Sequence, residues 1–105
     1  MNAKRAAKLM QIAHYYGEEK QVCKLMEELG EATSAASEVL MLLSYHEQGG
    51  KKRDLEALLE HLADVVNVTE QVIGLFGLET DFKVARHEGI HKTLRRIREE
   101  QDDEV

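Results

Sequence analysis

Proline and tryptophan are absent from this 105-residue sequence, and only three tyrosines, two phenylalanines and one cysteine occur. A chain without proline and with few aromatic residues favours helices over strands, so we predict an all-α fold. The lone Cys23 excludes an intrachain disulfide and a site built from several cysteines. The longest apolar stretch, residues 39–43, is too short to span a bilayer. With no signal peptide recognisable at the start, we expect a cytoplasmic protein that does not enter membranes.

Positive charge is also scarce. The 14 Lys and Arg residues stand against 20 Asp and Glu residues, which gives a net charge of -6. Phosphate backbones repel such a field, and this argues against binding to nucleic acid polymers. The length fits one domain, residues 1–105, of which residues 101–105 form an acidic tail. A domain of this size buries a thin core, so we expect a homodimer or a homotetramer.

Glycines divide the sequence into four segments. Gly17, the Gly49–Gly50 pair and Gly77 mark the breaks, as glycine does where helices end. The basic triplet at residues 51–53 is interpreted as part of a solvated turn. We therefore predict a four-helix subunit, with helices over about residues 3–16, 18–47, 53–76 and 80–100.

The second and third helices each carry apolar residues at alternating spacings of three and four, which predicts one buried seam on each helix. Because a short turn joins these two long helices, the seams should pack against each other as an antiparallel hairpin. The predicted seam residues are Val22, Leu25, Leu29, Ala32, Ala36, Val39 and Leu43 on the second helix, and Leu55, Leu58, Leu62, Val65, Thr69, Val72 and Phe76 on the third.

Polar residues flank both predicted seams in matching registers. Glu28 and Glu31 lie three residues apart beside the first seam, and His61 and Asp64 do so beside the second. Residues three apart on a helix have Cβ atoms about 5–6 Å apart, close enough for one cation to touch both. Oxygen ligands suit a hard divalent ion such as Mg²⁺ or Mn²⁺. Alternatively, these carboxylates are ordinary surface charges, with Lys24 paired to Glu28.

Three stretches of the sequence carry a resemblance to a known family. They are residues 16–21, 24–31 and 59–65, which read YGEEKQ, KLMEELGE and LEHLADV. The EExxE element of the second stretch, with the YGEE and LAD stretches on either side, resembles the MazG-like family of the all-α NTP pyrophosphohydrolase superfamily. The resemblance extends over about residues 13–97, to the basic stretch LRRI of the fourth helix.

The resemblance implies hydrolysis of a nucleoside triphosphate to the monophosphate and pyrophosphate, with Mg²⁺ or Mn²⁺ held by carboxylates. Carried over to this sequence, Glu28, Glu31 and Asp64 are the expected metal ligands, and Glu27 is the catalytic base or an outer ligand. The family's second element is ExxD, but here His61 stands in place of its glutamate. Either the imidazole ligates the metal, or the protein binds nucleotide or metal with weakened catalysis.

Basic and amide side chains are the candidates for substrate contacts. Similar proteins carry basic residues in the closing helix, which implies phosphate contacts for Lys92 and Arg95, together with Lys24 beside the carboxylates. Alternatively, Lys92 and Arg95 belong to a basic helix end that complements the helix dipole. Asn67 lies about one turn beyond Asp64 and either contacts a base or phosphate or faces solvent. The resemblance also implies substrate pockets completed at or near a subunit interface.

Overall fold

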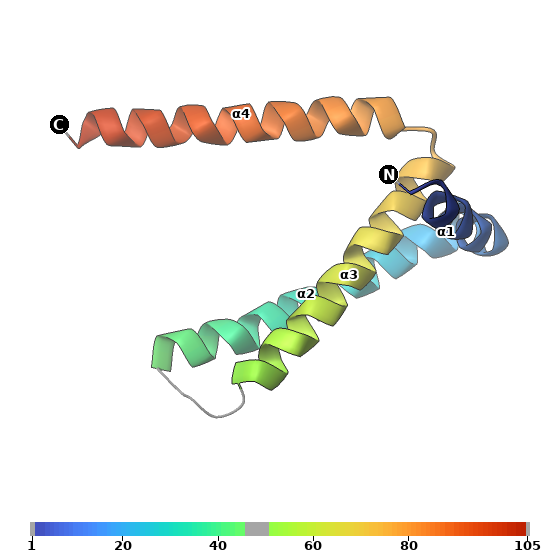
Figure 1. The fold of residues 1–105 in the computed structure, drawn as a ribbon, viewed down its shortest axis with the longest axis horizontal. Coiled ribbons are helices and arrows are strands. Elements are labelled where there is room, and N and C mark those ends of the chain that lie inside the picture. The colour runs from blue at the N-terminus through green and yellow to red at the C-terminus, as the bar shows by residue number, and fades with distance from the viewer. Residues whose placement is uncertain (1, 46–50, 105) are drawn as a thin grey trace.

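The computed structural model describes residues 2–45 and 51–104, and it confirms the all-α prediction. These residues form four helices and no strand (Figure 1): α1 (Ala3–Tyr16), α2 (Glu18–Tyr45), α3 (Lys51–Leu75) and α4 (Glu79–Asp103). Within the described ranges, none of the four helices combines the length and the hydropathy that a membrane crossing needs.

A side-chain cap and two glycines set helix ends at their predicted positions. The Asn2 side chain caps α1 by accepting hydrogen bonds from the N–H groups of Lys4 and Arg5, at 2.9 and 3.2 Å. Gly17 ends α1 with a φ of 88°, a left-handed conformation that glycine adopts without a Cβ clash. Gly77, with a φ of 65°, separates α3 from α4 in the same way.

Two helix boundaries differ from the prediction by more than one residue. α3 begins at Lys51 rather than at residue 53, so the basic triplet is helical and not part of a turn. Lysine and arginine are good helix formers, and no glycine or proline interrupts the sequence between residues 51 and 73. α4 continues to Asp103 rather than ending at residue 100, so most of the acidic tail is helical. Residues 46–47 of the predicted second helix and the diglycine lie outside the described residues.

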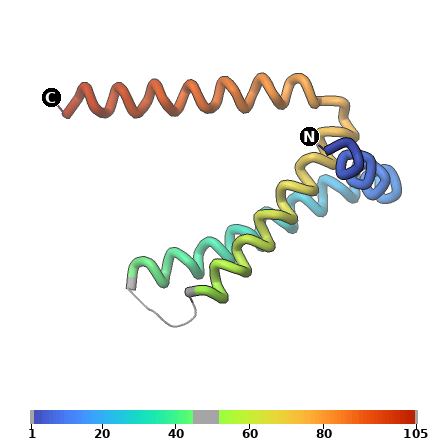
Figure 2. The backbone as a smooth tube through the Cα atoms, viewed as in Figure 1, coloured from blue at the N-terminus to red at the C-terminus, as the bar shows by residue number. Residues whose placement is uncertain are grey.

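α2 and α3 lie side by side along most of their length, and α1 crosses one end of this pair (Figure 1). α1 packs through Leu9 and Ala13, which are buried. At Gly74 of α3 an added Cβ atom would collide with the Met10 side chain of α1, so the glycine permits this close approach. The tube in Figure 2 shows that α4 leaves the pair, and α3 is the one described helix that it contacts.

The buried seam of each long helix is rotated by one residue from the predicted seam. One of the two predicted columns on each helix faces inward. The other is exposed, apart from half-buried Thr69, and the residues one position earlier are more buried. On α2, Gln21, Glu28 and Leu42 are buried instead of Val22, Leu29 and Leu43, and on α3 half-buried His61 replaces exposed Leu62. The rotation carries Glu28 and His61 from the flank of the seam to its inside. Both candidate faces of each helix contain apolar residues, so periodicity alone does not choose between them.

A second apolar stripe on α2 and α3 faces outward. Met26 and Leu59 are each 70 % exposed, and Leu40 is 62 % exposed. The buried apolar residues among those described are few and small in total volume: Leu9, Ala13, Ala32, Leu42 and Val68. The core of the single chain is therefore thin, while several large apolar residues of both long helices remain exposed.

Candidate metal centre

Glu28 lies inside the α2–α3 pair, with only 5 % of the residue exposed. Its position follows from the rotated seam, which places it two helical turns from buried Gln21 on the same face of α2. Carboxylates are rarely buried unless they are paired or bind a cation, because burial removes the water that stabilises their charge. A buried acid in so thin a core therefore marks this point of the fold as a candidate site.

Glu28, Glu31 and His61 form a group of potential metal ligands. One donor atom from each residue lies within 4.8 Å of the donor atoms of the other two. The glutamates come from one face of α2, and His61 reaches them from α3, with its Nδ1 atom 3.6 Å from Oε2 of Glu31. The structure thus brings together three of the four side chains that the sequence predicted as metal ligands.

Two atoms of this ligand group lack hydrogen-bond partners. Oε2 of Glu28 and Nδ1 of His61 are buried and have no partner in the part of the chain that the structure describes. The 3.6 Å between His61 and Glu31 is longer than a hydrogen bond. Leaving a buried polar group unpartnered costs about 1–3 kcal/mol. A divalent cation between these side chains would give both atoms a partner, so the donor set fits a metal ion.

Lys24 neutralises part of the acidic charge. Its Nζ atom lies 3.1 Å from Oε1 of Glu28 and 3.4 Å from Oε2 of Glu27. The contacts with Glu28 and then Glu27 raise the pKa of Lys24 above its usual 10.5. Half of the lysine side chain is exposed, so these ion pairs contribute little to folding. The lysine engages one oxygen of Glu28, whereas the other, Oε2, has no partner among the described residues.

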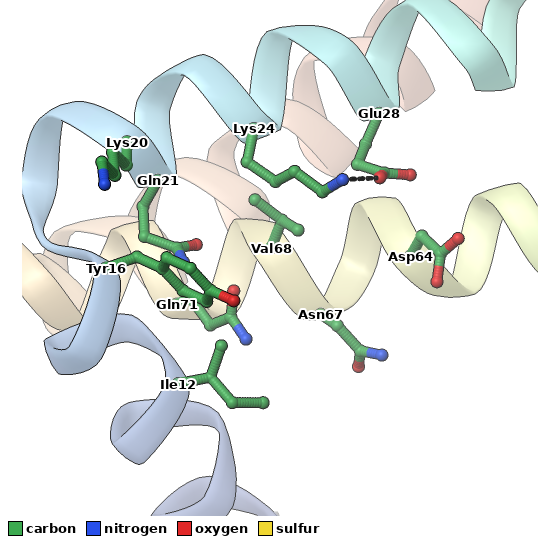
Figure 3. Close-up of a pocket in the computed structure, with 10 residues that line it drawn as sticks. All are labelled: Ile12, Tyr16, Lys20, Gln21, Lys24, Glu28, Asp64, Asn67, Val68 and Gln71. Carbon is green, nitrogen blue, oxygen red and sulfur yellow. Dashed lines mark ion pairs between the residues drawn. The ribbon is translucent and has the colours of Figure 1, made fainter.

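Asp64, the fourth predicted ligand, lies outside the group of three. It is half-buried on α3, and with Glu28 and Lys24 it lines a cavity of ≈ 520 Å³ between α1, α2 and α3 (Figure 3). Pockets for small ligands typically measure about 300–1,000 Å³. Asp64 therefore borders a space of suitable size for a ligand, and through Glu28 this space adjoins the metal-ligand group.

Two buried glutamines line the same cavity and were not predicted as site residues. Gln21 and Gln71 are 3 % and 4 % exposed, and Oε1 of Gln21 has no hydrogen-bond partner among the described residues. An amide both donates and accepts hydrogen bonds, as recognition of a polar heterocycle requires. Their spacing could have identified them in the sequence, because Gln21 lies seven residues before Glu28 and Gln71 lies seven residues after Asp64, which places each pair on one face of its helix. The remaining lining residues are Ile12, Tyr16, Lys20, Asn67 and Val68.

The other predicted site residues differ in their relation to the cavity. Asn67 lines it, as the substrate-contact prediction requires. Glu27 is exposed and paired with Lys24, and it borders a neighbouring surface depression rather than the cavity. Lys92 and Arg95 lie on α4, where they border a separate surface depression. Within one chain, the predicted phosphate contacts on α4 are therefore not brought to the carboxylates.

Comparisons with known proteins add no family assignment. No protein-family model, curated protein or solved structure matches this chain. A functional proposal therefore depends on the sequence motifs and on the geometry of the site.

Proposed function

We propose that this protein is a MazG-like, metal-dependent nucleoside triphosphate pyrophosphohydrolase, which converts a (d)NTP and water to the (d)NMP and pyrophosphate. The observation that carries the proposal is the buried Glu28 carboxylate. Its unpartnered Oε2 lies in a ligand group with Glu31 and His61, and the same residue lines a cavity of nucleotide size. The EExxE element and the LAD stretch are the sequence features that support the same activity.

The ligand group is proposed to hold Mg²⁺ or Mn²⁺. Glu28, Glu31 and His61 supply three donor atoms, and Asp64 is the proposed fourth ligand from the cavity side. A bound divalent ion supplies charge neutralisation for the phosphates and lowers the pKa of a coordinated water. The imidazole of His61 favours Mn²⁺ over Mg²⁺, because nitrogen ligands suit first-row transition metals.

The other lining residues are proposed to bind and orient the nucleotide. Lys24 offers a half-exposed ammonium group at the cavity wall beside Glu28, where it attracts phosphate oxygens. Asn67 lies on the same wall and offers an amide to the phosphate or the nucleoside. Tyr16 supplies an aromatic face against which a base can stack. Glu27 is the proposed base or outer ligand, and its ion pair with Lys24 places it beside the residue that also contacts Glu28.

The proposed enzyme is a cytoplasmic homodimer or homotetramer in which α2 and α3 form an antiparallel hairpin. The outward apolar stripe that includes Met26, Leu40 and Leu59 supports the assembly, since burial of such surface stabilises a helical bundle. The lone Cys23 supports the location, because a cytoplasmic protein needs no disulfide.

A binding protein with little turnover is the alternative function. His61 favours it, because the imidazole stands where similar enzymes have a glutamate and lies 3.6 Å from Glu31. The site then has one negative ligand fewer with which to bind a divalent ion. Nucleotide or metal would still bind to the same cavity and ligand group.

Release of pyrophosphate from a panel of canonical and modified nucleotides, with Mg²⁺ and with Mn²⁺, tests the two functions. Turnover by the wild type that is lost in Glu28→Gln supports hydrolysis. A ligand that binds only the native state raises the melting temperature, so a rise with Mn²⁺ or nucleotide but without turnover supports the binding alternative. Neither turnover nor a shift in melting temperature would reject both functions.

A further inference from the structure

Two histidines lie one turn apart on α4 and belong neither to the ligand group nor to the cavity. His87 and His91 are both exposed, and the centroids of their rings lie 4.3 Å apart. Residues four apart share one face of a helix, so the two imidazoles project from the same side of α4. Both border the surface depression on this helix, together with Glu88.

The spacing of these residues is one that binds metal on helices. Residues 87–91 read HEGIH, which matches the HExxH pattern. On a helix this pattern directs two imidazoles to one zinc ion and places the glutamate beside a metal-bound water. The pattern alone is short, but the ring contact shows that both imidazoles are within reach of one ion. Nitrogen ligands suit Zn²⁺ and other borderline first-row ions, whereas Mg²⁺ prefers oxygen.

The arrangement supports metal binding rather than peptide hydrolysis. Over residues 2–45 and 51–104, no third His, Cys, Asp or Glu donor joins the pair within 4.8 Å. Catalytic zinc sites have three protein ligands, so an ion held here would keep water in its remaining positions. The carboxylate of Glu88 borders the same depression as Lys92 and Arg95, and it offsets part of their repulsion of a cation.

α4 is a helix that a metal ion would stabilise. Of its described residues, all but half-buried Phe82 are exposed, and it extends away from the α2–α3 pair (Figure 1). Most of the stability of a helix in a protein comes from packing, which α4 has little of within one chain. Gly89 lies between the two histidines, and glycine has the lowest helix propensity of any residue in α4. The turn that the histidines span is therefore the intrinsically weakest turn of the helix.

We infer that His87 and His91 form a second metal site, which binds a borderline divalent ion such as Zn²⁺ and holds the turn of α4 that contains Gly89. One ion reaches both imidazoles only while this turn is helical. A ligand that binds only the ordered turn stabilises it by mass action. The inference is independent of the proposed hydrolysis, because neither histidine is in the ligand group or lines the cavity.

Amide hydrogen exchange, followed by mass spectrometry in EDTA, in Zn²⁺ and in Mg²⁺, tests the site in the full chain. At a Zn²⁺ concentration one hundred times its Kd, exchange at residues 85–95 should slow about tenfold or more. Mg²⁺ should leave exchange in this segment unchanged. Exchange that Zn²⁺ does not slow, or that Mg²⁺ slows equally, would overturn the site.

Interchanging two neighbouring residues tests the spacing. The double variant Arg86→His, His87→Arg keeps the composition and charge of α4, but its imidazoles lie five residues apart, about 140° around the helix axis. Because one imidazole then remains within reach of the ion, Zn²⁺ should bind at least about tenfold more weakly and should no longer slow exchange in α4. His91→Ala should have the same effect. His14→Ala, which removes an exposed histidine from α1, should keep the wild-type response. A wild-type response in the double variant or in His91→Ala would overturn the site.

Glu28→Gln separates this site from the carboxylate centre. Calorimetric titration with Zn²⁺ in this background, with and without His91→Ala, measures binding to α4 apart from the ligand group. Exchange in α4 should slow with Zn²⁺ as it does in the wild type, and this result without pyrophosphate release by the wild type would retain the histidine site while rejecting hydrolysis. A response of α4 that is lost in Glu28→Gln would place the ion at the ligand group and overturn the second site.

Discussion

Replacing Glu28 by methionine should stabilise the metal-free protein. Methionine and glutamate have similar helix propensity, and both side chains are long and unbranched. The change removes the orphaned Oε2 atom, whose burial costs about 1–3 kcal/mol, and the pair with half-exposed Lys24, which contributes little because solvent screens it. The balance is a gain of about 1–2 kcal/mol in the free energy of unfolding. For a domain of this size, each kcal/mol raises the melting temperature by about 4–8 °C.

When divalent metal is present, the wild type should become more stable than Glu28→Met. At a Mn²⁺ concentration one hundred times its Kd, the wild type should gain about 2.7 kcal/mol, while Glu28→Met should gain little. The assay is thermal unfolding followed by circular dichroism, in EDTA and in increasing Mn²⁺, at one fixed protein concentration. Glu38→Met is the matched control, because Glu38 is an exposed glutamate on the same helix. It should change stability by less than about 0.5 kcal/mol and keep the response to Mn²⁺.

Two results would refute this reasoning. If Glu28→Met is less stable than the wild type in EDTA, the folded chain stabilises the carboxylate without a metal, and the unpartnered oxygen has no functional meaning. If the variant responds to Mn²⁺ as the wild type does, the metal binds elsewhere or does not use Glu28. Either outcome would remove the observation on which the proposed function depends.

Three further perturbations test other parts of the molecule. His61→Glu should raise Mg²⁺ affinity about tenfold, or about 1.4 kcal/mol, by adding a negative oxygen ligand; unchanged calorimetric titration would show that this position does not limit the site. Gly30→Ala, whose new methyl group meets nothing, should stabilise the fold by about 0.5–1 kcal/mol in urea unfolding, whereas Gly74→Ala should stabilise it less, because the flexible end of Met10 must shift to admit the methyl group. The raised pKa of Lys24 means that its ion pairs stabilise the fold below pH 10.5 and are lost as the pH rises through the folded-state pKa. Between neutral and strongly alkaline pH, the wild type should therefore lose more stability than Lys24→Met, and parallel pH profiles would contradict this.

The helices could be predicted closely from the sequence because local chemistry sets their ends. Gly17 and Gly77 adopt positive φ angles that other residues avoid, so glycine placement predicted the ends of α1 and α3 to within one residue. The start of α3 was missed because lysine is compatible with both a turn and a helix. The residues at which the helices begin and end were therefore easier to predict than the rotation of each long helix about its own axis.

The orientation of the seams could not be predicted, because it depends on which neighbours each face meets. Val22 and Leu29 are apolar, yet they face outward, while their polar neighbours Gln21 and Glu28 face inward. A hydrophobic pattern counts apolar residues and takes no account of a ligand or a second subunit. Three of the four predicted ligands nevertheless lie together, without Asp64, and the pair Glu28 and Glu31 was predictable because the two residues keep their spacing whichever way the helix is rotated.

The inward polar residues and the outward apolar residues have a common explanation. The buried polar residues among those described are Gln21, Glu28 and Gln71, and all three line the same cavity beside the ligand group. A lone chain would be more stable with Leu29 turned inward and Glu28 turned outward, since burial of an apolar side chain is favourable and burial of a carboxylate is not. The observed register becomes favourable when a ligand occupies the polar interior and a second copy covers the apolar exterior. In the proposed assembly, ligand binding and the association of copies would depend on this one orientation of α2, so that weakening either should weaken the other.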